Sequence, residues 1–394
     1  MKSVFIWFVF LLSLSLYSVK VIGGISVADI SLIAFIAISF IIKRRIVLNA
    51  LNLSYLTWFV ISVLCFFLIV KEPYFDVEKY FFSTFRCLTG VLSLLFMPLW
   101  LNTIHEKYKV SMALKWFLIF NFFMQVVLMV SFFFNVGNFI NIVPFGDQSN
   151  RQDWFNVYSY GLYYRFGGLF EEPSWYAWFN IFCLSLCFSI SRKYNLHVVD
   201  KKVIFLTFLG IVFTFSVAGI FSFFIIAFFM VEKVKVKLLF SSMLSFIFLL
   251  VLIFFSENYF IERILSILSG GDGSANARLL GSLLKGFGIL QLLPFGSGFG
   301  NSINAIDFYI DKSLFVSGTA NQNGFVEAFI STGYVGGALY LFPIVSLFLN
   351  KSSRLLFFAI ALVFFTTSSI FIAPFWVLLG LSFYSLSIKN RNNS

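Results

Sequence analysis

Residues 203–231 read VIFLTFLGIVFTFSVAGIFSFFIIAFFMV, a run without a single charged side chain. A bilayer core about 30 Å thick needs about 20 apolar residues of helix, so this run is too long for one straight span and short for two. Weak helix formers lie at its middle (residues 215–219), and lysines stand on both sides of it. Because basic residues favour the cytoplasmic side, we expect the chain to go out and return here as two short or tilted helices.

The composition of the whole chain indicates the same class of protein. Of its 394 residues, 60% are hydrophobic and only 11% are charged, and the mean hydropathy is +0.94. A soluble domain carries about 25% charged residues, so a water-soluble globule is excluded, and so are disordered, collagen-like and disulfide-rich chains. We therefore expect an all-α, polytopic helical membrane protein that forms one integral membrane domain over residues 1–394.

Further apolar runs of membrane-spanning length recur along the chain. They lie at about 4–19, 25–42, 53–70, 80–101, 112–134, 173–191, 238–256, 325–349, 355–371 and 374–388. Together with the two helices expected within 203–231, they predict about twelve transmembrane helices.

The basic residues predict the orientation. Lys43, Arg44 and Arg45 follow the second run and place that connection in the cytoplasm, so both termini are expected to be cytoplasmic. The later basic connections fall on the same side. The net charge of +11 therefore reports membrane topology; the lipid bilayer is an expected partner and nucleic acid is not.

Two long connections fall on the outer side of this topology, at 135–172 and 256–323. Each mixes aromatic residues, glycines and charges, and long loops of this kind usually carry function. The two histidines, His105 and His197, map to cytoplasmic connections. A His-based triad or a His metal site on the outer face is therefore excluded by the predicted topology.

The second outer loop contains a predicted amphipathic helix, with Ser274 as its N-cap. Arg278, Ser282 and Lys285 share one face of it, and leucines cover the rest. Such a helix suits the membrane interface.

One segment before the span at 173–191 combines an arginine, aromatic residues and carboxylates. Arg165 follows Tyr164, and an arginine fork suits phosphate oxygens while an aromatic ring suits a sugar. Glu171 and Glu172 come next. The alternative interpretation is structural, because carboxylates favour a helix N-terminus and one of them can pair with Arg165.

Two further places carry polar groups at span ends. Arg86 lies about two turns below the outer end of its predicted span, where a charge usually faces a cavity or a partner; a side chain that snorkels to the surface is the alternative. Gln322 and Asn323 precede the span at 325–349 and suit a hydroxyl-rich ligand. The glycines of that span, such as Gly333, are also explained by close helix packing.

Taken in order, these segments resemble the O-antigen polymerase and ligase superfamily, which includes Wzy-type polysaccharide repeat-unit polymerases. The resemblance covers about residues 160–345 and consists of an Arg-x-x-Gly…Glu-Pro-Ser element, an Arg-Leu element, a Pro-x-Gly-x-Gly-x-Gly turn and an Asn…Glu…Gly-x-x-Gly element. The matching residues are Arg165, Gly168, Glu172, Pro173 and Ser174, then Arg278 and Leu279, then Pro294, Gly296, Gly298 and Gly300, and finally Asn323, Glu327, Gly333 and Gly336. Gln322 stands where the family's ligases have a histidine, which favours a polymerase. The family's Ser-Arg element matches residues 215–219 without the arginine.

The resemblance implies glycosyl transfer on the outer face of the bacterial cytoplasmic (inner) membrane. The donor would be a glycan chain on undecaprenyl diphosphate, and the acceptor a lipid-linked repeat unit of an O-antigen, a capsule or an exopolysaccharide. A protein that regulates chain length would be a further partner. No metal or other cofactor is expected, because arginine and lysine can stabilise the leaving diphosphate.

The expected site residues follow from these roles. Groups that stabilise the diphosphate or accept the proton of the attacking hydroxyl are the candidate catalytic residues: Arg165, Arg278, Glu171 and Glu172. The candidate substrate-binding residues are Arg86 and, in reserve, Lys285, which would also bind the diphosphate, together with Tyr164, Gln322 and Asn323. The alternatives are an O-antigen ligase, which uses a different acceptor such as lipid A–core, and a flippase or other transporter. A transporter is expected to show repeated halves and broken midplane helices, and 203–231 is the one interrupted span visible in the sequence.

Overall fold

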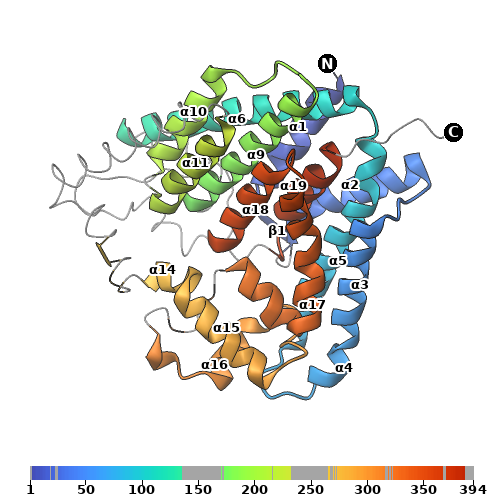
Figure 1. Ribbon diagram of the computed structural model, residues 1–394, viewed down its shortest axis with the longest axis vertical. Helices are drawn as coiled ribbons and strands as arrows, with labels where there is room; N and C mark the ends of the chain where they lie inside the picture. Colours follow the sequence, from blue (N-terminus) through green and yellow to red (C-terminus); the bar gives the residue numbers. More distant parts are fainter. Residues whose placement is uncertain are drawn as a thin grey trace. The chain divides into compact units, whose positions relative to one another are not determined.

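The computed structural model describes residues 2–17, 19–22, 25–134, 170, 173–214, 216–231, 265–266, 269, 271, 273–315, 318, 321, 323–366 and 370–386. Within these ranges the regular secondary structure is helical apart from one short antiparallel ribbon, formed by β1 (Lys20–Ile22) and β2 (Ile25–Ser26) (Figure 1). The predicted all-α class is thus confirmed for the described part of the chain.

Five described helices are long and apolar enough to cross a membrane: Ala50–Ile69, Val77–Trp100, Ile104–Val127, Ser174–Lys193 and Gly324–Leu349. Shorter apolar helices of 10–17 residues accompany them. These helices indicate a membrane protein and are compatible with a lipid bilayer. The count of about twelve spans stays a prediction, and the predicted span at 238–256 lies outside the described residues, as does most of the outer loop at 135–172.

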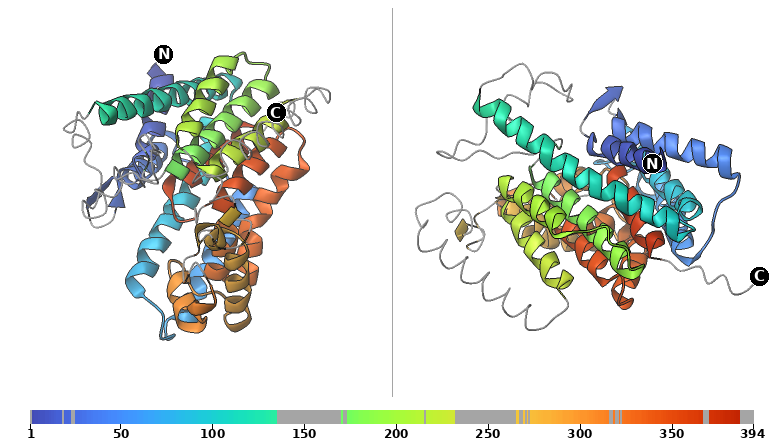
Figure 2. Two further views of the ribbon diagram at one scale, coloured as in Figure 1. Left: turned by 90° about the vertical axis from the view of Figure 1, so that its left-hand side faces the viewer. Right: turned by 90° about the horizontal axis from the view of Figure 1, so that it is seen from above.

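The chain forms two compact units, each of which contains several segments distant in sequence. The first unit comprises residues 1–34, 100–253 and 381–394. Its helices are α1 (Lys2–Ser15), the first half of α2 (Val27–Lys43), α6 (Ile104–Phe133), α9 (Pro173–Lys193), α10 (Lys201–Phe213) and α11 (Val217–Met230). α6 packs against α1, α9 and α10 (Figure 2).

The interruption predicted within 203–231 is present. α10 ends at Phe213 and α11 begins at Val217. Ser216 adopts an extended conformation between them, and its side chain accepts a hydrogen bond from the backbone N–H of Gly219. Ser216 is therefore the N-cap of α11, which explains why a serine at the middle of an apolar run separates two helices.

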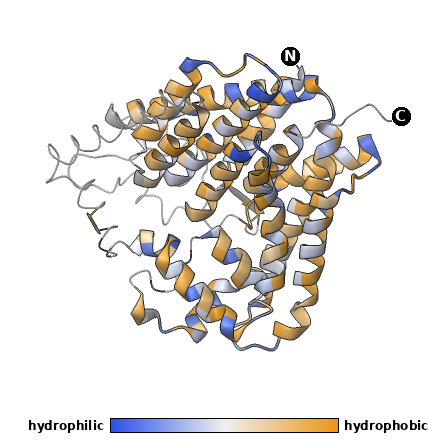
Figure 3. Ribbon diagram, viewed as in Figure 1, coloured by the Kyte–Doolittle hydropathy of each residue, from blue (hydrophilic) through white to orange (hydrophobic). Residues whose placement is uncertain are grey.

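The second unit comprises residues 35–99 and 254–380. Its elements are α3 (Ala50–Leu64), α4 (Phe66–Ile69), α5 (Val77–Trp100), α14 (Gly273–Arg278), α15 (Leu280–Leu292), α16 (Ser302–Tyr309), the 3-10 turn η2 (Lys312–Leu314), α17 (Gly324–Leu349), α18 (Arg354–Thr366) and most of α19 (Ala373–Ser385). Hydrophobic residues run along most of α3 and α17 (Figure 3). A fully buried aromatic core joins these helices: Tyr55, Trp58, Tyr340 and Trp376.

α17 is bent at Gly333, whose φ of 71° and ψ of −174° are not helical. The rings of Phe325 and Tyr340 both lie beside the ring of Phe364, with centroid distances of 4.7 and 6.0 Å. A straight helix would separate residues 325 and 340 by about 22 Å. The predicted span at 325–349 is therefore two arms: a short arm, residues 324–332, and a long arm, residues 334–349.

The amphipathic helix of the second loop differs from its prediction in two ways. The helical segment is divided at Leu279 into α14 and α15, and α14 begins at Gly273, so Ser274 lies inside the helix and is not its cap. A small hydrophobic core joins α15, α16 and the short arm of α17: Tyr74, Ile289, Ala305, Ile306, Val326 and Ile330.

Candidate functional site

Glu327 lies on the short arm of α17 and is only 3% exposed. One carboxylate oxygen, Oε1, accepts hydrogen bonds from the hydroxyl groups of Ser302 (2.7 Å) and Ser331 (2.8 Å). The other, Oε2, accepts one from the side-chain amide of Asn321 (3.1 Å). Burying a carboxylate is costly unless donors replace its water, and these three donors fulfil that need.

The polar contacts continue from Asn321 to α15. The side-chain oxygen of Asn321 accepts a hydrogen bond from the hydroxyl group of Ser282 and another from the backbone N–H of Asn323 (3.3 Å). Ser282 is fully buried. We call Glu327, Asn321, Ser282, Ser302 and Ser331 the Glu327 cluster; it connects α15, α16 and the short arm of α17.

Asn323 is the N-cap of α17. Its side-chain oxygen accepts hydrogen bonds from the backbone N–H groups of Phe325 (3.0 Å) and Val326 (3.2 Å). Its amide group donates to the main-chain carbonyl of Arg278 (2.7 Å). Asn323 therefore ties the end of α14, where the predicted diphosphate-binding Arg278 lies, to the first turn of α17.

Lys285 lies on the same buried side of α15 as Ser282 and is 0% exposed. Its ammonium group donates a hydrogen bond to the carbonyl of Gly318 (3.1 Å) and lies 5.4 Å from the centroid of the Phe315 ring. A buried ammonium is stable only with such partners. Ser282 and Lys285 of α15 thus face the protein interior, whereas Gln291 near its end is exposed.

The glycine-rich turn at 294–300 fills the break in α17. The backbone N–H of Ser297 donates to the carbonyl of Ile330 (2.7 Å), and the N–H of Gly298 donates to the carbonyl of Ser331 (3.0 Å). These carbonyls lie in the last turn of the short arm, where a helix end leaves acceptors without helical partners. The turn therefore supplies the donors that the interrupted helix lacks.

The turn at 294–300 and α17 approach each other closely at a pair of glycines. The N–H of Tyr334 donates to the carbonyl of Pro294 (3.1 Å). A Cβ atom at Gly296 would lie 2.5 Å from the nitrogen of Gly333, and one at Gly333 would lie 2.4 Å from the oxygen of Pro294. Both glycines also have positive φ values, so no other residue fits either position without strain.

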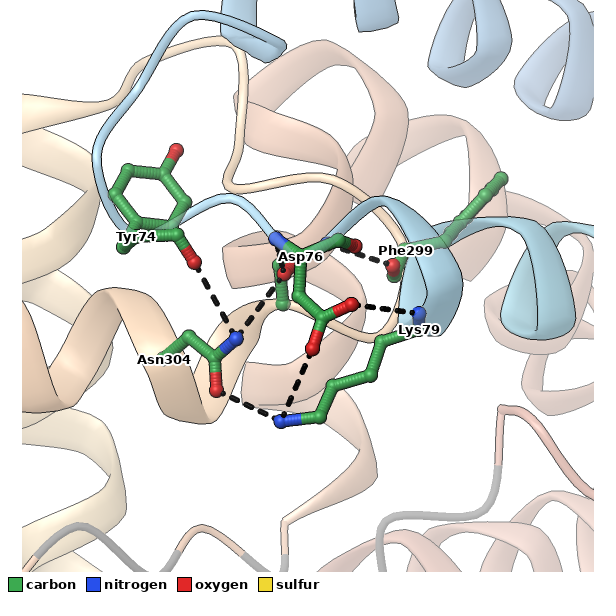
Figure 4. A network of polar contacts seen from close by, with 6 residues as sticks. Tyr74, Asp76, Lys79, Phe299 and Asn304 are labelled. Carbon is green, nitrogen blue, oxygen red and sulfur yellow. Dashed lines mark hydrogen bonds and ion pairs between the residues drawn. The ribbon is translucent and has the colours of Figure 1, made fainter.

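A second polar network fixes α16 to the turn between α4 and α5 (Figure 4). The backbone N–H of Asp76 donates to the side chain of Asn301 (2.8 Å). Asn304 accepts from the ammonium group of Lys79 (3.1 Å) and donates to the carbonyl of Tyr74 (3.3 Å). Asp76 and Lys79 are partly exposed and lie 3.7 Å apart. This network orients α16, which carries Ser302 to Glu327.

Next to this network, the hydroxyl group of Tyr309 donates to the carboxylate of Glu72 (2.8 Å). Burial, together with this hydrogen bond and the negative charge of Glu72, raises the pKa of Tyr309. Burial also raises the pKa of Tyr74, with smaller effects of Glu72 and Tyr309. Both tyrosines are therefore neutral over the physiological pH range, and the hydroxyl group of Tyr309 acts as a hydrogen-bond donor.

The structure describes four of the predicted site residues. Arg86 lies in α5 and Arg278 ends α14, and both are partly buried. The hydrogen bond from Asn323 to Arg278, and the packing of α15 on α14 and α17, bring Arg278, Lys285 and Asn323 into the same part of the second unit. The remaining candidates lie outside the described residues: Tyr164, Arg165, Glu171, Glu172 and Gln322.

Glu327 formed part of the resemblance but was not among the predicted site residues. Its signal was present, because Glu327 is the one charged residue between positions 324 and 349, and an ionisable residue in an apolar span usually has a functional or structural partner. Its donors Ser302 and Asn321 come from other segments, and no local pattern indicated them.

Among the residues that the structure describes, no group of three or more His, Cys, Asp or Glu side chains is arranged to hold a metal ion. A scan of the chain against protein-family models finds no match, and a search of curated proteins finds none either.

Proposed function

We propose that this protein is a membrane glycosyltransferase of the O-antigen polymerase type. It would transfer a glycan chain from undecaprenyl diphosphate to a lipid-linked repeat unit on the outer face of the bacterial cytoplasmic membrane. The supporting sequence evidence is the order and spacing of the four elements that resemble the Wzy-type family.

One structural observation carries the proposal: the three elements that the structure describes interlock. Asn323, from the element that opens α17, holds the carbonyl of Arg278, from the Arg-Leu element. The glycine-rich turn at 294–300 sits in the break of α17 at Gly333. Segments that share a site must meet in space, and these segments do so although up to 45 residues separate the contacting pairs in sequence.

The proposed chemistry is a displacement at the anomeric carbon of the donor. The terminal hydroxyl oxygen of the acceptor forms the new bond, the bond from that carbon to the diphosphate oxygen breaks, and the hydroxyl proton passes to a base. Glu171 or Glu172 is the proposed base. Arg165 and Arg278, together with Arg86, would stabilise the negative charge that develops on the leaving diphosphate.

Lys285 supports this proposal through its environment. An ammonium group in a low-dielectric interior attracts an anion more strongly than one in water. Lys285 is fully buried among protein groups, and its helix α15 begins at Leu280, two residues after Arg278. Arg278 and Lys285 would together bind the diphosphate.

The test uses purified protein in liposomes with a lipid-diphosphate oligosaccharide as both donor and acceptor, without an ion gradient. We expect longer glycans from the unaltered protein, and a loss of at least about tenfold in extension rate for Arg165→Ala and for Arg278→Ala, because each removes a charged hydrogen bond of about 1.5–3 kcal/mol. Lys71→Ala, at an exposed lysine outside the proposed site, is the matched control. Normal extension by both arginine variants contradicts the proposal.

A transporter of lipid-linked glycans is the second candidate, because the structure adds a second interrupted helix to the predicted one. α10 and α11 are separated at residues 214–216, and α17 is bent at Gly333; discontinuous helices are common in transporters. In the same liposomes, translocation of the oligosaccharide without extension identifies a transporter. Transfer to lipid A–core in place of a repeat unit identifies a ligase.

A further inference from the structure

We infer that the segment of the second unit formed by α15, the turn at 293–301 and the short arm of α17 is a re-entrant element. It lies within the thickness of the bilayer, with one face of α15 in contact with lipid acyl chains, and is not a cap in the aqueous phase. This inference does not depend on the chemistry proposed above.

The first observation is an exposed apolar stripe on α15. Leu280, Leu283, Leu284 and Phe287 follow the i, i+3, i+4, i+7 spacing of one helix face. All four are exposed, with 65% of Leu280, 53% of Leu284 and 60% of Phe287 accessible. We call these four residues the α15 stripe. No charged side chain interrupts it.

The opposite side of α15 is polar and buried. Ser282 and Lys285 are inaccessible and bond to Asn321 and Gly318. Gly286 faces Val326 of the short arm so closely that a Cβ atom would lie 2.6 Å from it. A helix at a water-exposed surface places its apolar stripe against the core and its polar residues outward. α15 instead buries Ser282 and Lys285, beside Ile289 and Leu290, and exposes the four apolar residues of the stripe, with Gln291 as the one exposed polar residue near its end. This pattern indicates that the medium outside the stripe is apolar.

The second observation concerns the helices against which the element packs. The ring of Phe299 in the turn lies 6.1 Å from that of Phe371, which precedes α19, and Phe325 of the short arm packs on Phe364 of α18 at 4.7 Å. The turn and the short arm are therefore in direct contact with α18 and with the residues that precede α19, and both α18 and α19 are apolar helices.

The third observation is the depth of the break in α17. The indole N–H of Trp58 donates to the hydroxyl group of Thr332 at the end of the short arm (3.4 Å), and Trp58 precedes the end of the Ala50–Ile69 helix pair by eleven residues, or about 16 Å. The turn extends from the ring of Phe299, which lies 5.3 Å from that of Trp58, to Gly298, which lies beside Ile69 at the end of that helix pair. Irregular backbone at membrane depth requires internal hydrogen-bond partners. The N–H groups of Ser297 and Gly298 have them on the short arm.

Exposed apolar residues also occur on the spanning helices of the same unit. Leu64 and Phe67 of the α3–α4 pair are exposed, as are Val335 and Phe342 of the long arm of α17. The partly exposed ion pair Asp76–Lys79 lies at the start of α5, where Asp76 and Lys79 bond to Asn301 and Asn304 of the turn and α16 (Figure 4). A lipid contact on α15 therefore agrees with the apolar exposed surface of the spanning helices.

The experiment measures the environment of nitroxide labels in liposomes. Leu280, Leu284 and Phe287 are replaced one at a time by cysteine, in full-length protein whose native cysteines are replaced by alanine. Collision rates of each label with molecular oxygen, which concentrates in lipid, and with a water-soluble nickel chelate are then compared. The labelled side chains are exposed, so the replacements leave the core unchanged; detergent elution profiles and thermal unfolding midpoints verify the fold.

Two positions calibrate the measurement. Phe342→Cys reports a lipid-facing position on the long arm of α17, and Ser313→Cys reports an exposed position in the polar turn η2. We expect the three stripe labels to favour oxygen over the nickel chelate by several-fold, as at position 342, and the label at position 313 to show the reverse preference.

Each other outcome overturns the inference. Stripe labels that respond to the nickel chelate as strongly as position 313 place α15 in water. Stripe labels that respond weakly to both reagents lie beneath another segment of this chain, a second copy or a different protein. Because the readout is structural, none of these outcomes bears on whether the protein extends glycans.

Discussion

The hydroxyl group of Ser302 in α16 donates a 2.7 Å hydrogen bond to the carboxylate of Glu327 in the short arm of α17. Together with Ser331 and Asn321, it gives this buried carboxylate three donors. Glu327→Ala would leave three buried donors without an acceptor, and each such loss costs about 1–3 kcal/mol. We therefore expect the thermal unfolding midpoint in detergent to fall by several degrees.

Two variants show whether this loss comes from the cluster. Glu327→Gln keeps one oxygen acceptor and should destabilise less than Glu327→Ala, although its amide group opposes one of the donors. Glu78→Ala removes an exposed carboxylate of α5 and should change the midpoint little. Equal effects of Glu327→Ala and Glu78→Ala would contradict a structural role of the cluster.

Gly333→Ala should be among the most destabilising single substitutions in the second unit. It adds a Cβ atom 2.4 Å from the oxygen of Pro294, and it places a side chain at a φ of 71° and a ψ of −174°, a region that only glycine populates readily. Backbone strain of about 1–3 kcal/mol adds to overpacking of about 1–3 kcal/mol. The measurement is the thermal unfolding midpoint together with the yield of folded protein.

Gly318→Ala is the matched control for this substitution. Gly318 also has a positive φ, of 55°, but a Cβ atom there would meet nothing within 4 Å. Gly318→Ala should lower the free energy of unfolding by about 1–2 kcal/mol, which is the cost of a left-handed backbone conformation without any steric overlap. If Gly333→Ala is no worse than Gly318→Ala, the close approach of the turn to α17 is not required for stability.

The contrast between two interrupted helices shows what the sequence can predict. The break between α10 and α11 has a local cause: Ser216 caps the second helix through the N–H of Gly219, and weak helix formers at the middle of 203–231 indicated it. The break at Gly333 has a tertiary cause, because the turn at 294–300 supplies its hydrogen bonds. No pattern within 325–349 distinguishes this glycine from others that pack helices closely.

α15 shows a second limit of sequence reasoning. The sequence predicted one amphipathic helix with Arg278, Ser282 and Lys285 on one face, whereas the structure divides it at Leu279 and leaves Arg278 on α14. Spacing alone also does not say which face is buried. The surrounding medium decides that, and here the polar face, with Lys285, points inward. Glu327 could also be recognised from the sequence, because it is the one charged residue of its span. Its donors Ser302 and Asn321 could not, because only the tertiary fold brings them to it.

In the first unit, Asp200 is predicted to stabilise the start of α10 in a pH-dependent way. It accepts a hydrogen bond from the backbone N–H of Val203 (2.9 Å) and pairs with Lys115 (2.9 Å). The hydrogen bond from Val203, and then the contact with Lys115, lower the pKa of Asp200. Because the pKa is lower in the folded state, the stabilisation is complete above the ordinary aspartate pKa of about 4 and is lost as the pH falls through the folded-state value.

Asp200→Ala and Asp200→Asn separate the two contacts. Asparagine keeps an N-cap and alanine does not, so we expect Asp200→Ala to cost about 1 kcal/mol and Asp200→Asn clearly less, since an exposed ion pair contributes little. Unfolding midpoints measured from pH 7 down to pH 3 should show the unaltered protein approaching Asp200→Asn below about pH 4. A difference that grows as the pH falls would contradict this assignment.

Asn323 has two roles that one substitution can separate. Asn323→Asp keeps an oxygen that accepts from the N–H groups of Phe325 and Val326, and a negative charge suits a helix N-terminus. It cannot donate to the carbonyl of Arg278, which its amide group now holds at 2.7 Å. We expect Asn323→Asp to retain most of the stability but to lose glycan extension, and Asn323→Ala to lose both.

The comparison of the two Asn323 variants needs both readouts. The unfolding midpoint reports the cap, and the extension rate per folded molecule reports the position of Arg278. Extension by Asn323→Asp at the normal rate would mean that the tie between α14 and α17 does not position a group that the reaction uses.

Lys285→Met tests whether the buried ammonium group serves binding or only packing. Methionine has a similar length and no charge, and replacing a buried charge by an apolar group is often neutral for stability. If Lys285 binds the diphosphate, the KM for the lipid-diphosphate donor should rise at least about tenfold, which is the loss of a charged hydrogen bond of about 1.5–3 kcal/mol. The unfolding midpoint should change little. Lys285→Arg keeps the charge and should restore part of the affinity, whereas a lower midpoint with an unchanged KM would assign Lys285 to its contact with Gly318 alone.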